Sequence, residues 1–177
     1  MLRYLKGTVD FELCYRKCDD GPTLIGYSDA DWASSTDNRR KISGYCFSLN
    51  GAGPLISWKS RKQPTVALSS CEAEYIALAA AVQEGMYLTQ MIKDIAKVSG
   101  PDLIFEDNQG TIALSKNPVN RQRSKHIDMQ YHFIRSMQNA GKIIIKYCPT
   151  ADMVADVMTK PITKLKLQKF RNYIFGP

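Results

Sequence analysis

The sequence predicts an α/β protein with one mixed sheet of five strands, flanked by helices. Three segments rich in aromatic and β-branched residues follow one another over residues 23–60. Two more such segments, 102–107 and 142–148, each follow a helical segment. Consecutive strands with short links pair antiparallel, whereas strands separated by helices are usually parallel. We therefore expect three antiparallel strands and then two parallel ones.

The antiparallel part begins with TLIGYSDADWA at 23–33 and ISGYCFSLN at 42–50, which are both expected as strands. The Gly-Ala-Gly turn at 51–53 returns the chain into PLISWKS at 54–60. Short links of this kind predict an antiparallel meander. Before it, residues 1–20 are expected to form a short helix and strand that lead into the domain.

Helical periodicity replaces strand alternation from residue 69 onward. Residues 69–97 are alanine-rich and apolar on nearly every side in their first half, which predicts a long buried helix. Ser69, with Glu72 three residues later, forms a capping-box pattern at its start. Further helices are expected at 108–117, 125–141, 151–159 and, in a basic amphipathic form, 162–177.

The composition favours one globular domain outside the membrane. The chain has 177 residues, 44% of them hydrophobic. It has no run of about 18 apolar residues that could span a bilayer, and no apolar stretch of signal-peptide length at its start. Its five cysteines are an odd number without such a signal, which indicates reduced thiols in an intracellular protein.

Positive charge is in excess and clustered. Lysine and arginine number 24 against 17 acidic residues, a net charge of +7, which favours a polyanionic partner. The basic residues gather at 38–41, 58–62, 120–126 and 164–171. Any one of these clusters could equally be a solvated face. Several of them beside an acidic site would point to a nucleic acid.

Acidic residues stand at distinct landmarks of this predicted structure. Asp29 and Asp31 lie two apart inside the first strand, so their side chains share one face. Strand interiors are depleted in aspartate and a buried unpaired charge is costly, so this pair requires an explanation. The other acids at landmarks are Glu74 in the first turn of the long helix, Asp107 at the end of the fourth strand and Asp156 on the helix at 151–159.

Each acid also has an ordinary structural interpretation. Glu72 is expected to be a capping residue, which leaves Glu74 without a structural role in its apolar stretch. Asp107 could cap the helix that follows it, and Asp152 could be an acid favoured by the helix dipole. Asp31 could form a salt bridge or support its neighbour. Singly these signals are weak, and it is their combination that suggests a site.

Carboxylates that are brought together repel, and they stay ionised only when cations neutralise them. Hard oxygen ligands of this kind suit Mg²⁺ or Mn²⁺. Two such ions about 4 Å apart can activate a water and stabilise the leaving oxygen in phosphodiester cleavage. The acids therefore favour a metal-dependent phosphodiesterase.

Five motifs occur in order along the chain: GYSDADWA, ALSSCEAEYIAL, EDNQGTIAL, SKHIDMQYHFIR and MVADVMTKP. Together they resemble the ribonuclease H domain of copia-type LTR retrotransposon polyproteins. LRYLKGT near the start resembles the segment that joins reverse transcriptase to that domain. The resemblance implies a connecting segment at 1–20, a ribonuclease H-like fold at 21–160 and a basic C-terminal tail at 161–177.

The resemblance also implies which acids bind metal. By motif position, the catalytic and metal-binding set is Asp29, Glu74, Asp107 and Asp156, with two Mg²⁺ ions that Mn²⁺ can replace. In the implied mechanism Asp29 bridges both ions, Glu74 and Asp107 complete one site, and Asp156 holds the second ion. Asp31 is then an auxiliary neighbour.

An RNA–DNA hybrid is the implied substrate, a polyanion bound mostly through its phosphates. The expected contacts are Ser69, Ser70 and Asn108, toward RNA 2′-hydroxyls, and Arg121, Arg123 and Lys125, toward phosphates. The reverse transcriptase domain of the same polyprotein is the second implied partner, and no membrane contact is expected. The implied location is intracellular, in a cytoplasmic virus-like particle if the element is active.

One feature departs from many cellular ribonucleases H, which carry a histidine on a loop before the last aspartate. Here that region reads KYCPTADMVA. The two histidines of the chain, His126 and His132, lie six residues apart on the preceding helical segment and so do not share a helical face. His126 is a candidate for an auxiliary role near substrate, against the alternative of a structural hydrogen bond.

Two other functions stay open at this point. The chain could be a non-catalytic hybrid- or RNA-binding module derived from a retrotransposon. It could also be another nuclease of the same superfamily, such as an integrase-like core. The intact acidic set favours an active ribonuclease over the first, and the ordered motifs argue against the second.

Overall fold

The computed structural model describes residues 2–15, 21–31, 40–51, 53–98, 100–116 and 125–176, without the side chains of 125–128. Its centre is one five-stranded sheet with the strand order β3-β2-β1-β4-β5. The strands are β1 (Leu24–Asp31), β2 (Ile42–Leu49), β3 (Leu55–Lys62), β4 (Asp102–Glu106) and β5 (Ile143–Tyr147).

The pairing of the strands confirms the predicted mixed sheet. β1 pairs antiparallel with β2, and β2 pairs antiparallel with β3. β4 pairs in parallel with both β1 and β5. Because β1 and β4 are parallel neighbours, their carboxyl ends meet at the same edge of the sheet. That edge receives Asp29 near the end of β1 and Asp107 just after β4.

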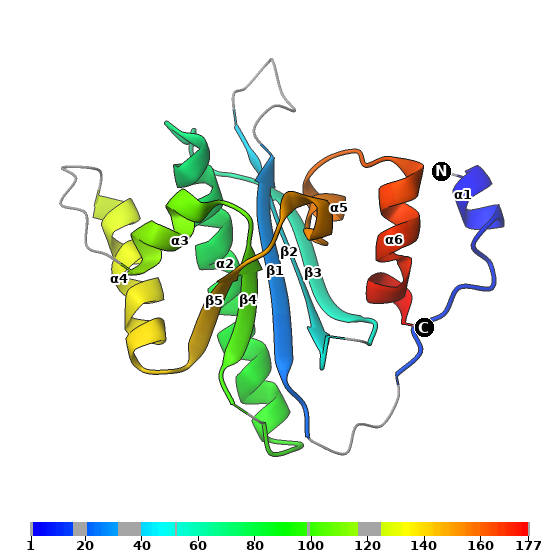
Figure 1. Ribbon diagram of the computed structural model, residues 1–177, viewed down its shortest axis with the longest axis horizontal. Helices are drawn as coiled ribbons and strands as arrows, with labels where there is room; N and C mark the ends of the chain where they lie inside the picture. The colour runs from blue at the N-terminus through cyan, green and yellow to red at the C-terminus, as the bar shows by residue number, and fades with distance from the viewer. Residues whose placement is uncertain are drawn as a thin grey trace.

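Helices cover both faces of the sheet (Figure 1). One face carries α2 (Ser70–Lys93), α3 (Gln109–Lys116) and α4 (Lys125–Asn139), and the other carries α5 (Asp156–Thr159) and α6 (Lys164–Phe175). The first layer is the larger core, where Leu78 and Val82 of α2 lie buried with Phe47 and Ile104 of the sheet. Burial of such side chains contributes roughly 1.5–3 kcal/mol each, so this layer anchors α2 firmly.

The prediction of one helix over 151–159 is wrong. The structure has a 3₁₀ turn, η1 (Thr150–Asp152), and the separate short helix α5. Between them Met153 is extended, with φ −70° and ψ 100°, and its side chain is fully buried. Met153, Val154 and Ala155 pack with Phe170 of α6 in a second hydrophobic core, which lies on the face of the sheet that α5 and α6 cover. Burial of these side chains therefore outweighs continuation of the helix.

The segment before β1 also differs from its prediction. The helix α1 (Leu2–Lys6) forms, but the described residues 7–15 contain no strand. They run beside the C-terminal helix instead, with Phe11 edge-on to Phe175 at 5.2 Å between ring centroids. The Tyr15 hydroxyl donates to the Leu55 carbonyl oxygen at 2.9 Å. None of the described helices is both long and apolar enough to cross a bilayer.

Candidate active site

Three of the predicted acids meet at the edge where β1 and β4 end. Each of Asp29, Glu74 and Asp107 offers a carboxylate oxygen, and these oxygens all lie within 4.8 Å of one another. Asp29 comes from β1 and Asp107 follows β4, while Glu74 reaches the edge from the first turns of α2. The parallel pairing of β1 with β4 and the packing of α2 therefore bring these three acids together in space.

This acidic trio, Asp29, Glu74 and Asp107, fits a hard divalent cation. Its donor atoms are carboxylate oxygens, which Mg²⁺ and Mn²⁺ prefer. Glu74 Oε2 is buried and has no hydrogen-bond partner among the described residues. An orphaned buried acceptor is costly, so a ligand that satisfies it would stabilise the site.

The electrostatics of the trio point the same way. Burial, together with the charges of Glu106 and Asp29, raises the pKa of Glu74 to about 10, against an ordinary value of 4.5. Burial also raises the pKa of Asp29 to about 6, although the Thr159 hydroxyl and the Lys160 ammonium lower it. Carboxylates that resist ionisation without a cation are those that a bound metal ion would ionise.

Asp156, the fourth predicted acid, lies on α5 and is fully buried. It is not part of the trio, and ammonium groups contact both of its oxygens. Lys160 Nζ lies 2.7 Å from Asp156 Oδ1 and 3.8 Å from Asp29 Oδ2, so this lysine bridges the two acids. Lys166 of α6 forms an ion pair with Asp156 Oδ2.

The position of α5 depends on Gly44 of β2, which is the register partner of Asp29. A Cβ at Gly44 would lie 2.6 Å from Thr159 Cγ2 and 2.7 Å from Met158 Cβ. The bare backbone therefore lets α5 lie directly on the sheet beside Asp29. In that position the Thr159 hydroxyl donates to Asp29 Oδ2.

Sequence reasoning missed Glu106, a fully buried carboxylate at the end of β4. The Ser28 hydroxyl donates to Glu106 Oε2 at 2.7 Å, and the Asn108 backbone N–H donates to Oε1 at 3.2 Å. Burial raises its pKa well above the ordinary value. Strand alternation could have found it, because Glu106 shares a face with the core residue Ile104.

Lys160 and Lys166 were missed as well. Lys160 lies four residues after Asp156, a spacing that places two side chains on the same side of a helical turn, and that signal could have found it. Lys166 belongs to a different helix, and only the packing of α6 brings it to Asp156. Two lysines of the basic cluster at 164–171, Lys166 and Lys169, are thus paired with aspartates.

The capping interpretation of Glu72 is confirmed. Ser69 Oγ accepts from the Glu72 backbone N–H at 3.1 Å, and the Glu72 carboxylate accepts from the Leu68 N–H at 2.9 Å. Asp107 is not the cap of α3, because Asn108 Oδ1 accepts from the Thr111 N–H. Asp107 instead accepts a hydrogen bond from Thr150 Oγ1 at 2.6 Å.

The predicted nucleic-acid contacts are only partly placed. Ser69 is half-buried and Ser70 is exposed at the start of α2, and Asn108 lies beside Asp107. Arg121 and Arg123 lie outside the described residues, as do the side chains of Lys125 and His126. The remaining auxiliary candidate, Asp31, is half-buried at the end of β1 and is not a member of the trio.

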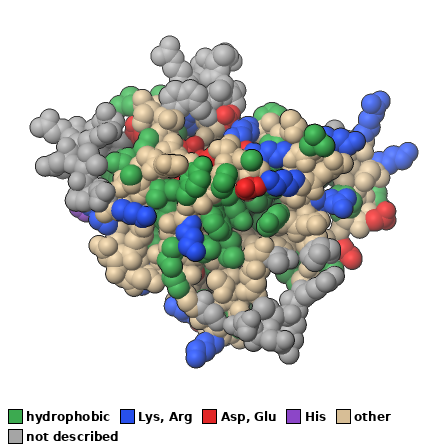
Figure 2. All heavy atoms as spheres, in the orientation of Figure 1, with side chains coloured by type: hydrophobic (Ala, Val, Ile, Leu, Met, Phe, Trp, Pro, Cys, Tyr) green, Lys and Arg blue, Asp and Glu red, His purple; other side chains and the backbone are tan. Residues whose placement is uncertain are grey.

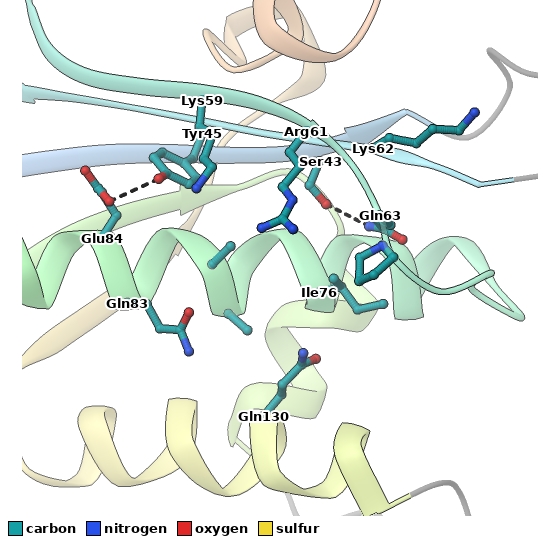
Figure 3. A pocket seen from close by; sticks show the side chains of 13 residues that line it. Ser43, Tyr45, Lys59, Arg61, Lys62, Gln63, Ile76, Gln83, Glu84 and Gln130 are labelled. Atoms are coloured by element: carbon teal, nitrogen blue, oxygen red, sulfur yellow. Dashed lines mark hydrogen bonds between the residues drawn. The ribbon is translucent and has the colours of Figure 1, made fainter.

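Three residues of the basic cluster at 58–62 line a cavity that has no member of the trio among its described lining residues, and these three are Lys59, Arg61 and Lys62. The cavity, of about 340 Å³, lies on the flank of α2, with Arg61 of β3 on one side and Gln130 of α4 on the other (Figure 3). Ile76 lines this cavity too, and it lies on the opposite side of α2 from Glu74 because two residues are about 200° apart on a helix. The basic side chains on the face seen in Figure 2 gather mainly over the half that holds α5 and α6.

Comparisons with known proteins agree with this geometry. No protein-family model matches the chain. The chain is 38% identical over 168 residues to the Pol polyprotein of transposon TNT 1-94 from Nicotiana tabacum, a match that covers 95% of the chain. It is 39% identical over 175 residues to the Pol polyprotein of transposon RE2 from Arabidopsis thaliana, with 98% of the chain covered. The chain spans only 12% of the length of each of these relatives.

Solved structures share the fold at low sequence identity. RNase H1 of the archaeon Halobacterium salinarum matches with a TM-score of 0.54 at 17% identity, covering 77% of this chain and 94% of that one. LC11-RNase H1, solved in complex with an RNA/DNA hybrid, matches with a TM-score of 0.56 at 14% identity and the same coverage of both chains. The fold is therefore that of the ribonucleases H, carried by a sequence that is homologous to one segment of plant retrotransposon Pol polyproteins.

Proposed function

We propose that this domain is a metal-dependent endoribonuclease that hydrolyses the RNA strand of RNA–DNA hybrids during retrotransposon reverse transcription. The observation that carries the proposal is the meeting of Asp29, Glu74 and Asp107 oxygens within 4.8 Å, on a ribonuclease H fold. A binding module has no need for buried carboxylates held in mutual repulsion.

The chain's own residues divide the work. Asp29, Glu74 and Asp107 would hold one divalent cation. Asp156 together with Asp29 would hold a second, in place of the Lys160 ammonium that bridges these two acids. When bound, such cations supply an activated water and stabilise the leaving oxygen of the phosphodiester. Mg²⁺ is the proposed physiological ion, with Mn²⁺ as its substitute, because both prefer carboxylate oxygens.

Neighbouring groups prepare these ligands. The Thr159 hydroxyl orients Asp29 through its Oδ2, and the Thr150 hydroxyl orients Asp107 through its Oδ2. Ser28 and the backbone N–H of Asn108 occupy both oxygens of Glu106, which keeps that acid beside the trio without making it a free ligand. Such supporting hydrogen bonds fix the geometry of metal ligands.

The proposed partners follow from the relatives and from the surface. A hybrid duplex would meet the acids at the open edge of the sheet, with Ser69, Ser70, Asn108, Arg121, Arg123 and Lys125 as its proposed contacts. The reverse transcriptase of the same polyprotein would supply the hybrid, as the relatives are Pol polyproteins of which this chain matches 12%. Its setting would be an intracellular virus-like particle.

A strand-specific cleavage assay tests the proposal. The chain is mixed with an RNA–DNA hybrid labelled on the RNA strand, in Mg²⁺ and then in Mn²⁺, beside an all-DNA duplex and the Asp29→Asn variant. Cleavage of RNA in the hybrid alone, lost in the variant, is the expected result. Hybrid binding without cleavage in either metal would instead support the non-catalytic binding module.

A further inference from the structure

The C-terminal helix α6 sends two lysines to the segment that carries Asp156. Lys166 forms an ion pair with Asp156 Oδ2, and its ammonium also donates to the Thr150 carbonyl oxygen at 2.7 Å. One turn further along α6, Lys169 forms an ion pair with Asp152 and donates to the Ala151 carbonyl oxygen at 3.0 Å. Lysine side chains of α6 therefore contact both backbone carbonyls and carboxylates of the segment that contains the η1 turn and α5.

The segment that carries Asp156 has little means of fixing itself. Helix α5 is only four residues long, and the extended Met153 precedes it. Isolated helical turns of this length are unstable because nucleation is costly. Helix α6 is better anchored, since Phe170 is 1% exposed in the second core and Thr163 caps its start by accepting from the Lys166 N–H.

The two oxygens of Asp156 meet different lysines. Lys166 contacts Oδ2 from the side of α6, whereas Oδ1 faces Lys160, the lysine that also lies 3.8 Å from Asp29. Oδ1 is therefore the oxygen of Asp156 that shares a lysine with Asp29 of the trio. Without Lys166, the Asp156 carboxylate would be held by Lys160 alone, and its rotation about χ2 would be less restricted.

We propose that Lys166 is a positioning residue of the metal site, which holds Asp156 Oδ2 so that Oδ1 stays on the side of Lys160 and Asp29. The inference rests on the proposed function, in which Asp156 is a ligand of the second cation. It assigns to α6 a part in building the site. The basic character of this helix is then explained by its contacts with aspartates, in addition to any nucleic acid.

Lys169 provides a matched control. Like Lys166, it lies on α6, pairs with an aspartate of the same segment and donates to a backbone carbonyl. Unlike Asp156, its partner Asp152 is about half exposed and is not a proposed metal ligand. A general loss of attachment between α6 and η1 would affect both lysine variants, whereas a positioning role would affect only the Lys166 variant.

Calorimetric titration of the metal-free chain with Mn²⁺, without nucleic acid, tests the inference. The wild type is expected to bind two ions, and Lys166→Met to raise the Kd of the weaker ion about tenfold, a typical cost of losing a group that supports a metal ligand. Lys166→Arg should restore part of that affinity, and Lys169→Met should stay within about twofold of the wild type. Thermal melting is recorded for every variant.

An unchanged or lower Kd in Lys166→Met would overturn the inference. So would a fall in its melting temperature with no change in Mn²⁺ affinity, since that result describes a merely structural ion pair. The Asp156→Asn variant distinguishes the positioning role of Lys166 from the proposed role of Asp156 as a metal ligand. Loss of the weaker ion in Asp156→Asn but not in Lys166→Met sinks the positioning role alone, whereas two ions retained in Asp156→Asn contradict both that role and the proposed second metal ligand.

Discussion

The two halves of the acidic site are neutralised in different ways. In the trio, Glu74 Oε2 has no partner among the described residues, and burial raises the pKa of Glu74 to about 10. Asp156 is more deeply buried, yet Lys160 and Lys166 contact its two oxygens. One half is thus incomplete without an added cation, and the other half carries cations of its own.

The contrast between the lysine pairing of Asp156 and the raised pKa of Glu74 shows two ways in which one fold can keep buried acids close together. A buried carboxylate must be paired, protonated or bound to metal, because an isolated charge is too costly to bury. Asp156 is paired with lysines, whereas Glu74 must be either protonated or bound to a metal ion. The lysine that bridges Asp29 and Asp156 links the two halves, so changes in one half are felt in the other.

Asp29→Asn should have the largest effect on cleavage, because it changes both halves of the site. Asp29 belongs to the trio and also contacts Lys160 and Thr159. We expect the rate of hybrid cleavage to fall by roughly 10³-fold or more, a loss of several kcal/mol of transition-state stabilisation. Circular dichroism should show the fold retained. A variant that cleaves at the wild-type rate would refute the assignment of the site.

Gly44→Ala should disturb the Asp156 half more than the trio, in which it affects only the Thr159 hydrogen bond to Asp29. The added Cβ would lie 2.7 Å from Met158 Cβ, so α5 must move away from the sheet. Overpacking of this kind costs about 1–3 kcal/mol. We expect cleavage to fall by roughly tenfold or more, as expected when a catalytic group is displaced, while Mn²⁺ binding at the trio persists in a calorimetric titration. Loss of every bound ion would show that the halves are not separable.

The stability of the metal-free chain should fall as the pH rises. The folded state raises the pKa of Glu74 from 4.5 to about 10, so it binds a proton more tightly than the unfolded state does. The associated stability is present below the ordinary glutamate pKa and is lost as the pH rises toward the folded one. Between pH 5 and pH 8 this linkage removes about 4 kcal/mol of stability, so we expect the melting temperature to drop by roughly 10 °C.

Magnesium and substitution at Glu74 should both weaken that pH dependence. Bound Mg²⁺ neutralises the ionised trio, and Glu74→Gln removes the titrating group. Glu72→Gln is the matched control, since Glu72 lies in the same first turns of α2 but serves its cap. If the melting temperature falls equally with pH in the Glu74 and Glu72 variants, Glu74 is not the group that causes the pH dependence.

Ser28→Ala should have a smaller effect, because it leaves the buried Glu106 Oε2 without the hydroxyl that lies 2.7 Å from it. The cost of an unsatisfied buried acceptor is about 1–3 kcal/mol, measured by denaturant unfolding. Cleavage should also slow several-fold, because Glu106 lies next to the trio. Thr89→Val is the control, since it breaks a comparable buried bond to Asp102 that lies away from the site; an equal loss of activity there would make the Ser28 effect one of stability alone.

Glu72→Gln should change least. It weakens a capping interaction, which costs about 1 kcal/mol of stability or less. Cleavage activity should stay within about twofold of the wild type, in contrast to a Glu74 variant. An inactive Glu72 variant beside an active Glu74 variant would reverse the roles of the two acids.

Local rules were sufficient for the fold, and together with the motif resemblance they identified the trio. Strand alternation and the change to helical periodicity gave the sheet, and the parallel pairing of β1 with β4 explains why Asp29 and Asp107 meet. The capping box separated Glu72 from Glu74 correctly. These features depend on neighbours in sequence or on the general geometry of parallel strands, so patterns in the sequence carry them.

The surroundings of Asp156 depend on packing between distant segments, which no local pattern records. Lys166 meets Asp156 only because Phe170 anchors α6 in the second core. Burial of Met153 split the predicted helix at 151–159. The need for a glycine at position 44 likewise arises only when α5 lies on the sheet.

Anomalous diffraction from crystals of the chain soaked in Mn²⁺ tests the central claim most directly, because it locates the ion without reference to activity. The account predicts a strong Mn²⁺ peak coordinated by carboxylate oxygens of Asp29, Glu74 and Asp107, and its loss in Asp29→Asn. A saturating Mn²⁺ soak that leaves no peak within coordination distance of these carboxylates would contradict it.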